Sequence, residues 1–239
     1  DYLENLTGFG WLFIQPLILL AVYAFVFSTI FQARLPESAG VGFVPFLAVA
    51  FWPWTAFAES IVKASGSIRN NSALIGKVAF ATEMLPLASV TATFLMNAAG
   101  YLAVLIVLLA FGVELHLSTL PLVLVLLVLF WMLASAIAMV TSTLQVFIRD
   151  IAQILPPLMT FWFFTTPIVY SPELMPEQLS WIADWNLAAW FVGMFRSLLL
   201  FGSLDLSLAW AVIVILIPVL FWFGLGFLRR FSGHFEDFL

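Results

Sequence analysis

The residues best suited to bind a partner lie in one polar segment, Ser65–Pro86, the longest basic interruption of an otherwise apolar sequence. Arg69 and Lys77 give it positive charge, and Lys63 lies just before it. A short amphipathic run places four apolar side chains on one predicted helical face, namely Ile68, Leu74, Ile75 and Val78. Unpaired polar groups are costly in hydrocarbon, so we predict that this segment lies at a membrane surface or against another protein. We call it the elbow.

Residues for covalent or nucleotide chemistry are lacking. The chain has no cysteine and only two histidines, His116 and His234, which are far apart in the sequence. A phosphate-binding loop of the form G-x-x-x-x-G-K-[ST] does not occur, because the Gly76-Lys77 pair lacks the other residues of the motif. We therefore predict a protein that is no enzyme and holds no cofactor or metal of its own, and any ATP that it uses is bound elsewhere.

Composition predicts the elements that position the elbow. Of 239 residues, 64% are hydrophobic and 9% charged, and the mean hydropathy is +1.14, which indicates an integral membrane protein. Long runs without charge predict an all-α bundle of six transmembrane helices in one transmembrane domain, 1–239. The predicted spans are about 8–31, 43–62, 87–111, 120–145, 154–170 and 206–228. Because the chain begins at Asp1 rather than at a methionine, we expect a further segment before it.

The connection between the fifth and sixth predicted spans, residues 171–205, is the longest in the chain. Its apolar stretch Leu187–Phe201 is too short to span a membrane and contains Arg196, which favours a re-entrant or interfacial helix. Pro176–Ala183 is predicted to form a shorter partner of that helix. Asp184 or Asn186 is predicted to cap the start of the helix.

Lysine and arginine side chains set the predicted orientation. With the elbow in the cytoplasm, six basic residues face inside and two, Arg34 and Arg196, face outside. This positive-inside bias predicts that both termini are cytoplasmic. The inner set is Lys63, Arg69, Lys77, Arg149, Arg229 and Arg230.

Several ionisable residues have two open interpretations. Glu59 is either a residue of a transport pathway or an interfacial carboxylate paired with Lys63 at i+4. Arg149 and the adjacent Asp150 are predicted to make separate contacts, because neighbouring residues on a helix face different ways. Arg196 is either a structural anchor or a ligand of the substrate.

Aromatic side chains are abundant, with 26 phenylalanines and 10 tryptophans. Tyr23, Phe27 and Phe31 recur every four residues on the first predicted span, and Trp162 lies in an aromatic cluster on the fifth. Flat amphipathic rings can stack on a passing substrate without a fixed hydrogen-bond register, so these four are predicted to line a substrate channel together with Glu59. Ordinary packing or an interfacial belt is the alternative.

Three blocks of residues carry a resemblance to a known family. In chain order they are Gly8, Trp11 and Pro16; then Asn71, Leu74, Ile75, Lys77, Val78, Phe80, Glu83, Leu85 and Pro86; then Arg149, Asp150, Gln153, Pro156, Pro167, Ile168, Tyr170, Pro176, Asn186 and Arg196. This pattern resembles the type-2 ABC export permeases, especially those that export O-antigen and other cell-surface polysaccharides. Ala81 and Thr82 depart from it by replacing a proline and an arginine, and Leu187 replaces another proline.

The resemblance implies a multi-pass protein of the bacterial inner membrane that forms a homodimer with two cytoplasmic ABC ATPase subunits. Those subunits would bind ATP and Mg²⁺, and a lipid-linked polysaccharide would cross between the protomers, with membrane lipids around them and no nucleic acid involved. Residues implied in coupling are Asn70, Asn71, Leu74, Ile75, Lys77, Glu83, Arg149 and Asp150. Residues implied in a periplasmic gate are Pro167, Tyr170, Asn186 and Arg196.

Three alternatives to this function are open. Within the same family, the cargo is a drug, teichoic acid or lipo-oligosaccharide instead. From a different class, an ion-coupled secondary transporter would need ionisable groups in mid-membrane, and only Glu59 approaches that description. For the elbow itself, the alternative to docking is a solvated loop with a snorkelling lysine.

Overall fold

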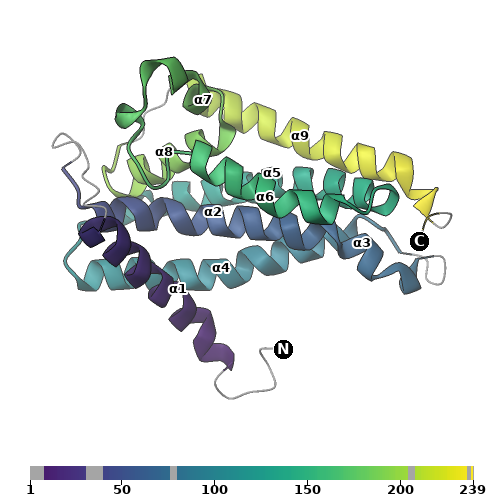
Figure 1. Cartoon of the computed structure of the whole chain (residues 1–239), viewed down its shortest axis with the longest axis horizontal. Helices are drawn as coiled ribbons and strands as arrows, with labels where there is room; N and C mark the ends of the chain where they lie inside the picture. Colours follow the sequence, from purple (N-terminus) through teal and green to yellow (C-terminus); the bar gives the residue numbers. More distant parts are fainter. Residues whose placement is uncertain (1–7, 31–39, 76–79, 204–207, 236–237, 239) are drawn as a thin grey trace. The chain divides into compact units, whose positions relative to one another are not determined.

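The computed structural model describes residues 8–30, 40–75, 80–203, 208–235 and 238, and these form helices, turns and loops without strands. Figure 1 shows the order of the helices along the chain. The long helices are α1 (Gly8–Ala24), α2 (Phe43–Ser65), α4 (Met84–Ala110), α5 (Leu120–Phe147), α6 (Ile151–Thr165), α8 (Leu187–Leu199) and α9 (Leu208–Ser232). A π-helical stretch, Phe25–Ile30, continues α1, and short helices include α3 (Ser67–Asn70) and α7 (Ser180–Asp184). The predicted all-α class is confirmed for the described residues.

Four stretches of helix are long and apolar enough to cross a membrane: Phe43–Ser65, Met84–Ala110, Leu117–Phe147 and Trp210–Ser232. They coincide with the second, third, fourth and sixth predicted spans. Helices also occupy the first and fifth positions, but their apolar stretches, Ile14–Phe27 and Ile151–Thr165, are shorter. The count of six spans therefore stays a prediction.

The fifth predicted span, 154–170, has different bounds in the structure. Helix α6 begins at Ile151 and ends at Thr165, so the predicted end at Tyr170 is wrong by five residues. Proline at position 167 explains the early end, because the residue before a proline is disfavoured in the helical conformation and proline itself has no N–H to donate. A break here frees main-chain carbonyls near Pro167 for side-chain donors.

The chain forms two compact units, and the first comprises residues 1–55, 95–126 and 163–205. Its interior contains the start of α2, where Leu47, Ala48, Val49 and Ala50 are buried. Pro53 lies within α2 and has no N–H, so the carbonyl of Val49 lacks its usual helical donor. The buried hydroxyl of Tyr101, on α4, donates to that carbonyl at 3.0 Å. One side chain thereby satisfies the acceptor that the proline leaves open.

The second unit comprises residues 56–94, 127–162 and 206–239. The rings of Phe57 on α2 and Phe130 on α5 stack with centroids 4.5 Å apart and an interplanar angle of 3°. Gly224 brings α9 close to α5, because a Cβ at this glycine would lie 2.7 Å from the carbonyl oxygen of Ala136. On a different face of α5, the small residues Ala134, Ala138 and Ser142 are also buried inside the protomer.

Candidate functional site

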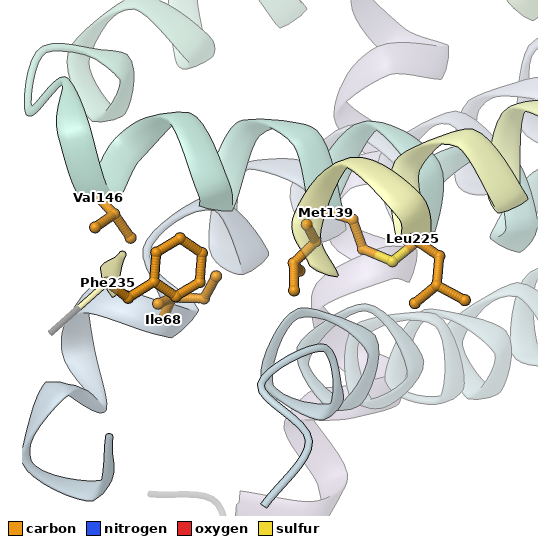
Figure 2. Close-up of a cluster of buried hydrophobic side chains, with 6 residues drawn as sticks. Ile68, Met139, Val146, Leu225 and Phe235 are labelled. Atoms are coloured by element: carbon orange, nitrogen blue, oxygen red, sulfur yellow. The ribbon is translucent and has the colours of Figure 1, made fainter. Parts of the chain in front are cut away.

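The elbow begins with α3, which inserts one apolar side chain into a hydrophobic cluster. Ile68 is fully buried in this cluster, which we call the inner cluster; it consists of Ile68, Met139, Val146, Leu225, Leu228 and Phe235. Figure 2 shows the ring of Phe235 against Ile68, with Val146 beside them, and Met139 facing Leu225. The first turn of the elbow is thus packed against α5, α9 and the segment after α9.

The predicted single helical face of the elbow is interrupted. Helix α3 ends at Asn70, and after Asn71 the backbone forms a 3₁₀ turn, Ser72–Leu74. Asparagine favours such a break because its side chain can bond the local backbone, and the Asn71 Nδ2 donates to the carbonyl of Ser67 at 2.8 Å. Continuous helix through Ile75 is therefore wrong.

Candidate coupling residues in the elbow differ in accessibility. Asn70 is exposed and Asn71 half-buried, so both amides remain near the surface. Ile75 is half-buried against the inner cluster, so its side chain is partly engaged within the protomer. The backbone of Leu74 lies in the 3₁₀ turn, whereas Lys77 falls outside the described residues.

Glu83 closes the elbow with an ion pair to α9. Its Oε1 accepts hydrogen bonds from Arg229 Nε at 2.9 Å and from an Arg229 terminal nitrogen at 2.7 Å. Partial burial raises the pKa of Glu83, but its backbone hydrogen bond and the Arg229 guanidinium outweigh that effect and hold the pKa below its ordinary value. Glu83 precedes the first residue of α4, and Arg229 lies in the last turn of α9. Each charge therefore also interacts favourably with the dipole of the helix end where it lies.

Arg149 and Asp150 lie in the turn between α5 and α6, and both are exposed. They form no ion pair within the described part of the chain, and separate contacts to a partner or to lipid headgroups stay a prediction. The main-chain carbonyl of Asp150 accepts from Gln153 and Ile154 and so starts α6. Both side chains lie at the surface at this end of α5.

The predicted channel residues pack against α2. Tyr23 lies 4.7 Å from Phe51 and Phe27 lies 5.9 Å from Phe43, measured between ring centroids. Trp162 meets Phe57 edge-on at 5.3 Å. Phe31 falls outside the described residues.

These contacts are the packing expected under the alternative interpretation, and the role of Tyr23, Phe27 and Trp162 in a channel stays a prediction. Glu59 forms the ion pair with Lys63 that the i+4 spacing indicated, with Oε1 and Nζ 2.6 Å apart. A pathway role for Glu59 likewise stays a prediction.

The predicted gate residues meet around the break after α6. Asn186 caps α8, as predicted, by accepting from the N–H of Ala188 at 3.0 Å. Its Nδ2 donates to Thr166 Oγ1 at 2.9 Å. The Tyr170 hydroxyl donates to the carbonyl of Phe164 at 3.1 Å. Helix α8 is thereby fixed to the residues that follow α6.

Arg196 makes the densest set of polar contacts in this region, although it is only 4% exposed. Its guanidinium donates to the carbonyls of Phe46 at 3.1 Å, Pro167 at 2.7 Å and Ile168 at 2.7 Å. The guanidinium carbon lies 3.4 Å from the centroid of the Phe46 ring. With these donors committed to the backbone, the geometry favours the anchoring interpretation over substrate binding.

Two contacts were missed by the sequence interpretation. Arg229 was used only to orient the chain, and its pairing with Glu83 joins residues 146 positions apart. Phe235 had no signal at all, because an aromatic residue after a predicted span is also typical of an interfacial belt. Among the described residues, no cluster of three or more His, Asp or Glu side chains is placed to hold a metal ion.

Residues 2–200 match the family described as ABC-2 type transporter. The chain is similar to an O-antigen export system permease protein RfbA of Klebsiella pneumoniae, at 26% identity over 100% of this chain and 90% of that protein. A protein of the same name from Myxococcus xanthus is 30% identical over 74% of this chain and 66% of its own length.

Proposed function

We propose that this chain, which belongs to the ABC-2 type transporter family, is the membrane subunit of an ATP-driven exporter of a lipid-linked polysaccharide. The observation that carries the proposal is the similarity over the whole chain to proteins named O-antigen export system permease. The permease has six spans in one transmembrane domain, both termini lie in the cytoplasm, and the membrane is the bacterial inner membrane. Two copies form the channel at their interface.

ATP and Mg²⁺ bind to two separate ATPase subunits, and the elbow receives the movement of those subunits. Support comes from the exposed Asn70 amide, the exposed Arg149 and Asp150, and the anchoring of Ile68 in the inner cluster. A segment that is polar outside and anchored inside can transmit force, whereas a solvated loop would dissipate it.

The outer side is closed by the region 171–205, in which α7 and α8 form the re-entrant pair. Arg196 and Asn186 hold α8 to the break after α6, so the gate has a rigid edge. Tyr23 on α1 and Phe27 on its π-helical continuation are only half-buried, so the exposed part of each ring contacts the passing glycan, since stacking on sugar faces tolerates sliding.

The test is charge reversal in the elbow, Lys77→Glu combined with Leu74→Asp. We expect ATP hydrolysis by the complex to continue while glycan export falls, because the elbow no longer docks. Surface glycan on intact cells and ATPase activity of the purified complex are the two measurements. Unchanged export in the double variant would remove the coupling role, and export of a hydrophobic drug instead of glycan would change the substrate.

A further inference from the structure

We infer that Arg229 and Phe235, near the end of the described chain, are positioning residues that clamp the elbow to α9, so that the elbow and the last span move as one body. This inference rests on the proposed function. It identifies α9 as the helix that receives the movement of the elbow, which the proposed docking of the elbow does not specify. We call the two contacts described next the C-terminal clamp.

The clamp holds the elbow at both of its ends. At the start of the elbow, Ile68 is fully buried in the inner cluster with Leu225 and Leu228 of α9 and with Phe235 (Figure 2). At its end, Glu83 accepts two hydrogen bonds from Arg229. Displacement of the elbow therefore reaches α9 through one apolar and one ionic contact.

The segment after α9 is itself fixed to α5. The ring centroid of Phe147, the last residue of α5, lies 6.1 Å from that of Phe235 and 4.9 Å from that of Phe238. Phe235 is fully buried and so fills the space between α3 and α5. Without its ring, Ile68 would lose one wall of its site, and α3 would be held less firmly.

The ionic contact is suited to coupling rather than to folding. The Glu83 side chain is 13% exposed but that of Arg229 is 60% exposed, so the pair is open to water on the guanidinium side, and ion pairs open to water contribute little to folding stability. Their removal should leave a folded protein. The pair nevertheless fixes the direction in which α4 and α9 follow the elbow, because one carboxylate oxygen accepts both donors of the guanidinium edge.

The first experiment compares Glu83→Gln, Arg229→Gln and the double variant in the full chain with its partner ATPase. We expect the ATP hydrolysed per glycan exported to rise about fivefold or more, at the low end of allosteric couplings. The double variant should be no worse than either single one, because both remove the same contact. Arg230→Gln is the matched control, since Arg230 is the adjacent exposed arginine and forms no ion pair in the described part of the chain.

A second experiment replaces the clamp with a covalent link. The chain has no cysteine, so cysteines at positions 83 and 229 can be joined selectively by a short bifunctional thiol reagent. We expect the unlinked protein to hydrolyse more ATP per glycan exported than the wild type does. The linked protein should return to the wild-type ratio, because the covalent link holds positions 83 and 229 together as the ion pair does. The Phe235→Ala variant should show the same poor coupling.

The outcomes separate the clamp from the proposed function. Wild-type coupling in both single variants, or a link that blocks export, would overturn the clamp and leave the exporter intact. Additive losses in the double variant would also overturn it, because they would show two unrelated roles. Failure of the wild-type complex to export any glycan would instead overturn the proposed function and the clamp with it.

Discussion

The variant Tyr101→Phe isolates the hydrogen bond that compensates for Pro53. In the wild-type chain the Val49 carbonyl accepts from the Tyr101 hydroxyl at 3.0 Å, and both residues are buried. Phenylalanine keeps the packing of the ring but leaves the carbonyl unpaired. An unsatisfied buried acceptor costs about 1–3 kcal/mol, so we expect the free energy of unfolding to fall by that amount.

A second variant, Pro53→Ala, tests the cause. Alanine at position 53 restores an N–H four residues after Val49, which is the donor of a regular helix. In that background Tyr101→Phe should cost less than about 1 kcal/mol, because the carbonyl keeps a partner. The interaction between the two sites should therefore be about 1 kcal/mol or more.

The assay is unfolding of the purified chain in detergent micelles by increasing dodecyl sulfate, followed by helical circular dichroism. Four proteins are needed: the wild type, the two single variants and the double variant. These four proteins form a double-mutant cycle, in which Tyr101→Phe is compared within each background. Any separate effect of removing the proline ring therefore cancels. An equal loss in both backgrounds, or no loss in the wild-type background, would refute the reasoning that Tyr101 protects the carbonyl opened by Pro53.

Three further predictions concern other contacts. Gly224→Ala should lower the free energy of unfolding by about 1–3 kcal/mol, because its Cβ would meet an α5 carbonyl. Gly226→Ala, with nothing within 4 Å of its Cβ, should be neutral or slightly stabilising in the same dodecyl sulfate unfolding measurement. Arg196→Lys should lower the free energy of unfolding by about 2–4 kcal/mol, because one ammonium cannot reach three carbonyls in the geometry of the guanidinium. Wild-type resistance of this variant to dodecyl sulfate would contradict the prediction. In the folded protein the pKa of Glu83 is below its ordinary value of 4.5. The small contribution of its carboxylate to folding stability should therefore be complete above pH 4.5 and be lost as the pH falls through the folded pKa. The difference in stability between wild type and Glu83→Gln should thus shrink from neutral pH to acid, and a growing difference would reverse the assigned sign.

The elbow and the residues after α6 follow a common principle. In each, a charged side chain joins a helix end to a distant part of its own unit: Glu83 with Arg229 in one, and Arg196 with the carbonyls after α6 in the other. Helix ends leave main-chain groups without partners. Such ends are therefore natural positions for side chains that hold or transmit a conformational change.

The sequence by itself determined the helical class, most of the helix positions and the family. Apolar runs near the length of a membrane span predicted α2, α4, α5 and α9, because hydrocarbon admits few polar groups and demands internal hydrogen bonds. Local rules also gave Asn186 as one of two candidate caps and the pairing of Glu59 with Lys63 as one of two interpretations, since both contacts depend on residues only two to four positions apart.

Only the tertiary structure decided which distant groups meet. The burial of Ile68 depends on how α3 packs against α5, α9 and the segment after α9. Pro53 indicates that the carbonyl of Val49 lacks a helical donor, but no rule of sequence spacing predicts Tyr101 as the residue that donates to it. Likewise, Arg229 could pair with any acid near the membrane surface, and Arg196 with any acceptor near α8. Such contacts join segments tens to more than a hundred residues apart. Tertiary packing therefore decides which residues meet, and the periodicity of the sequence does not predict the partners.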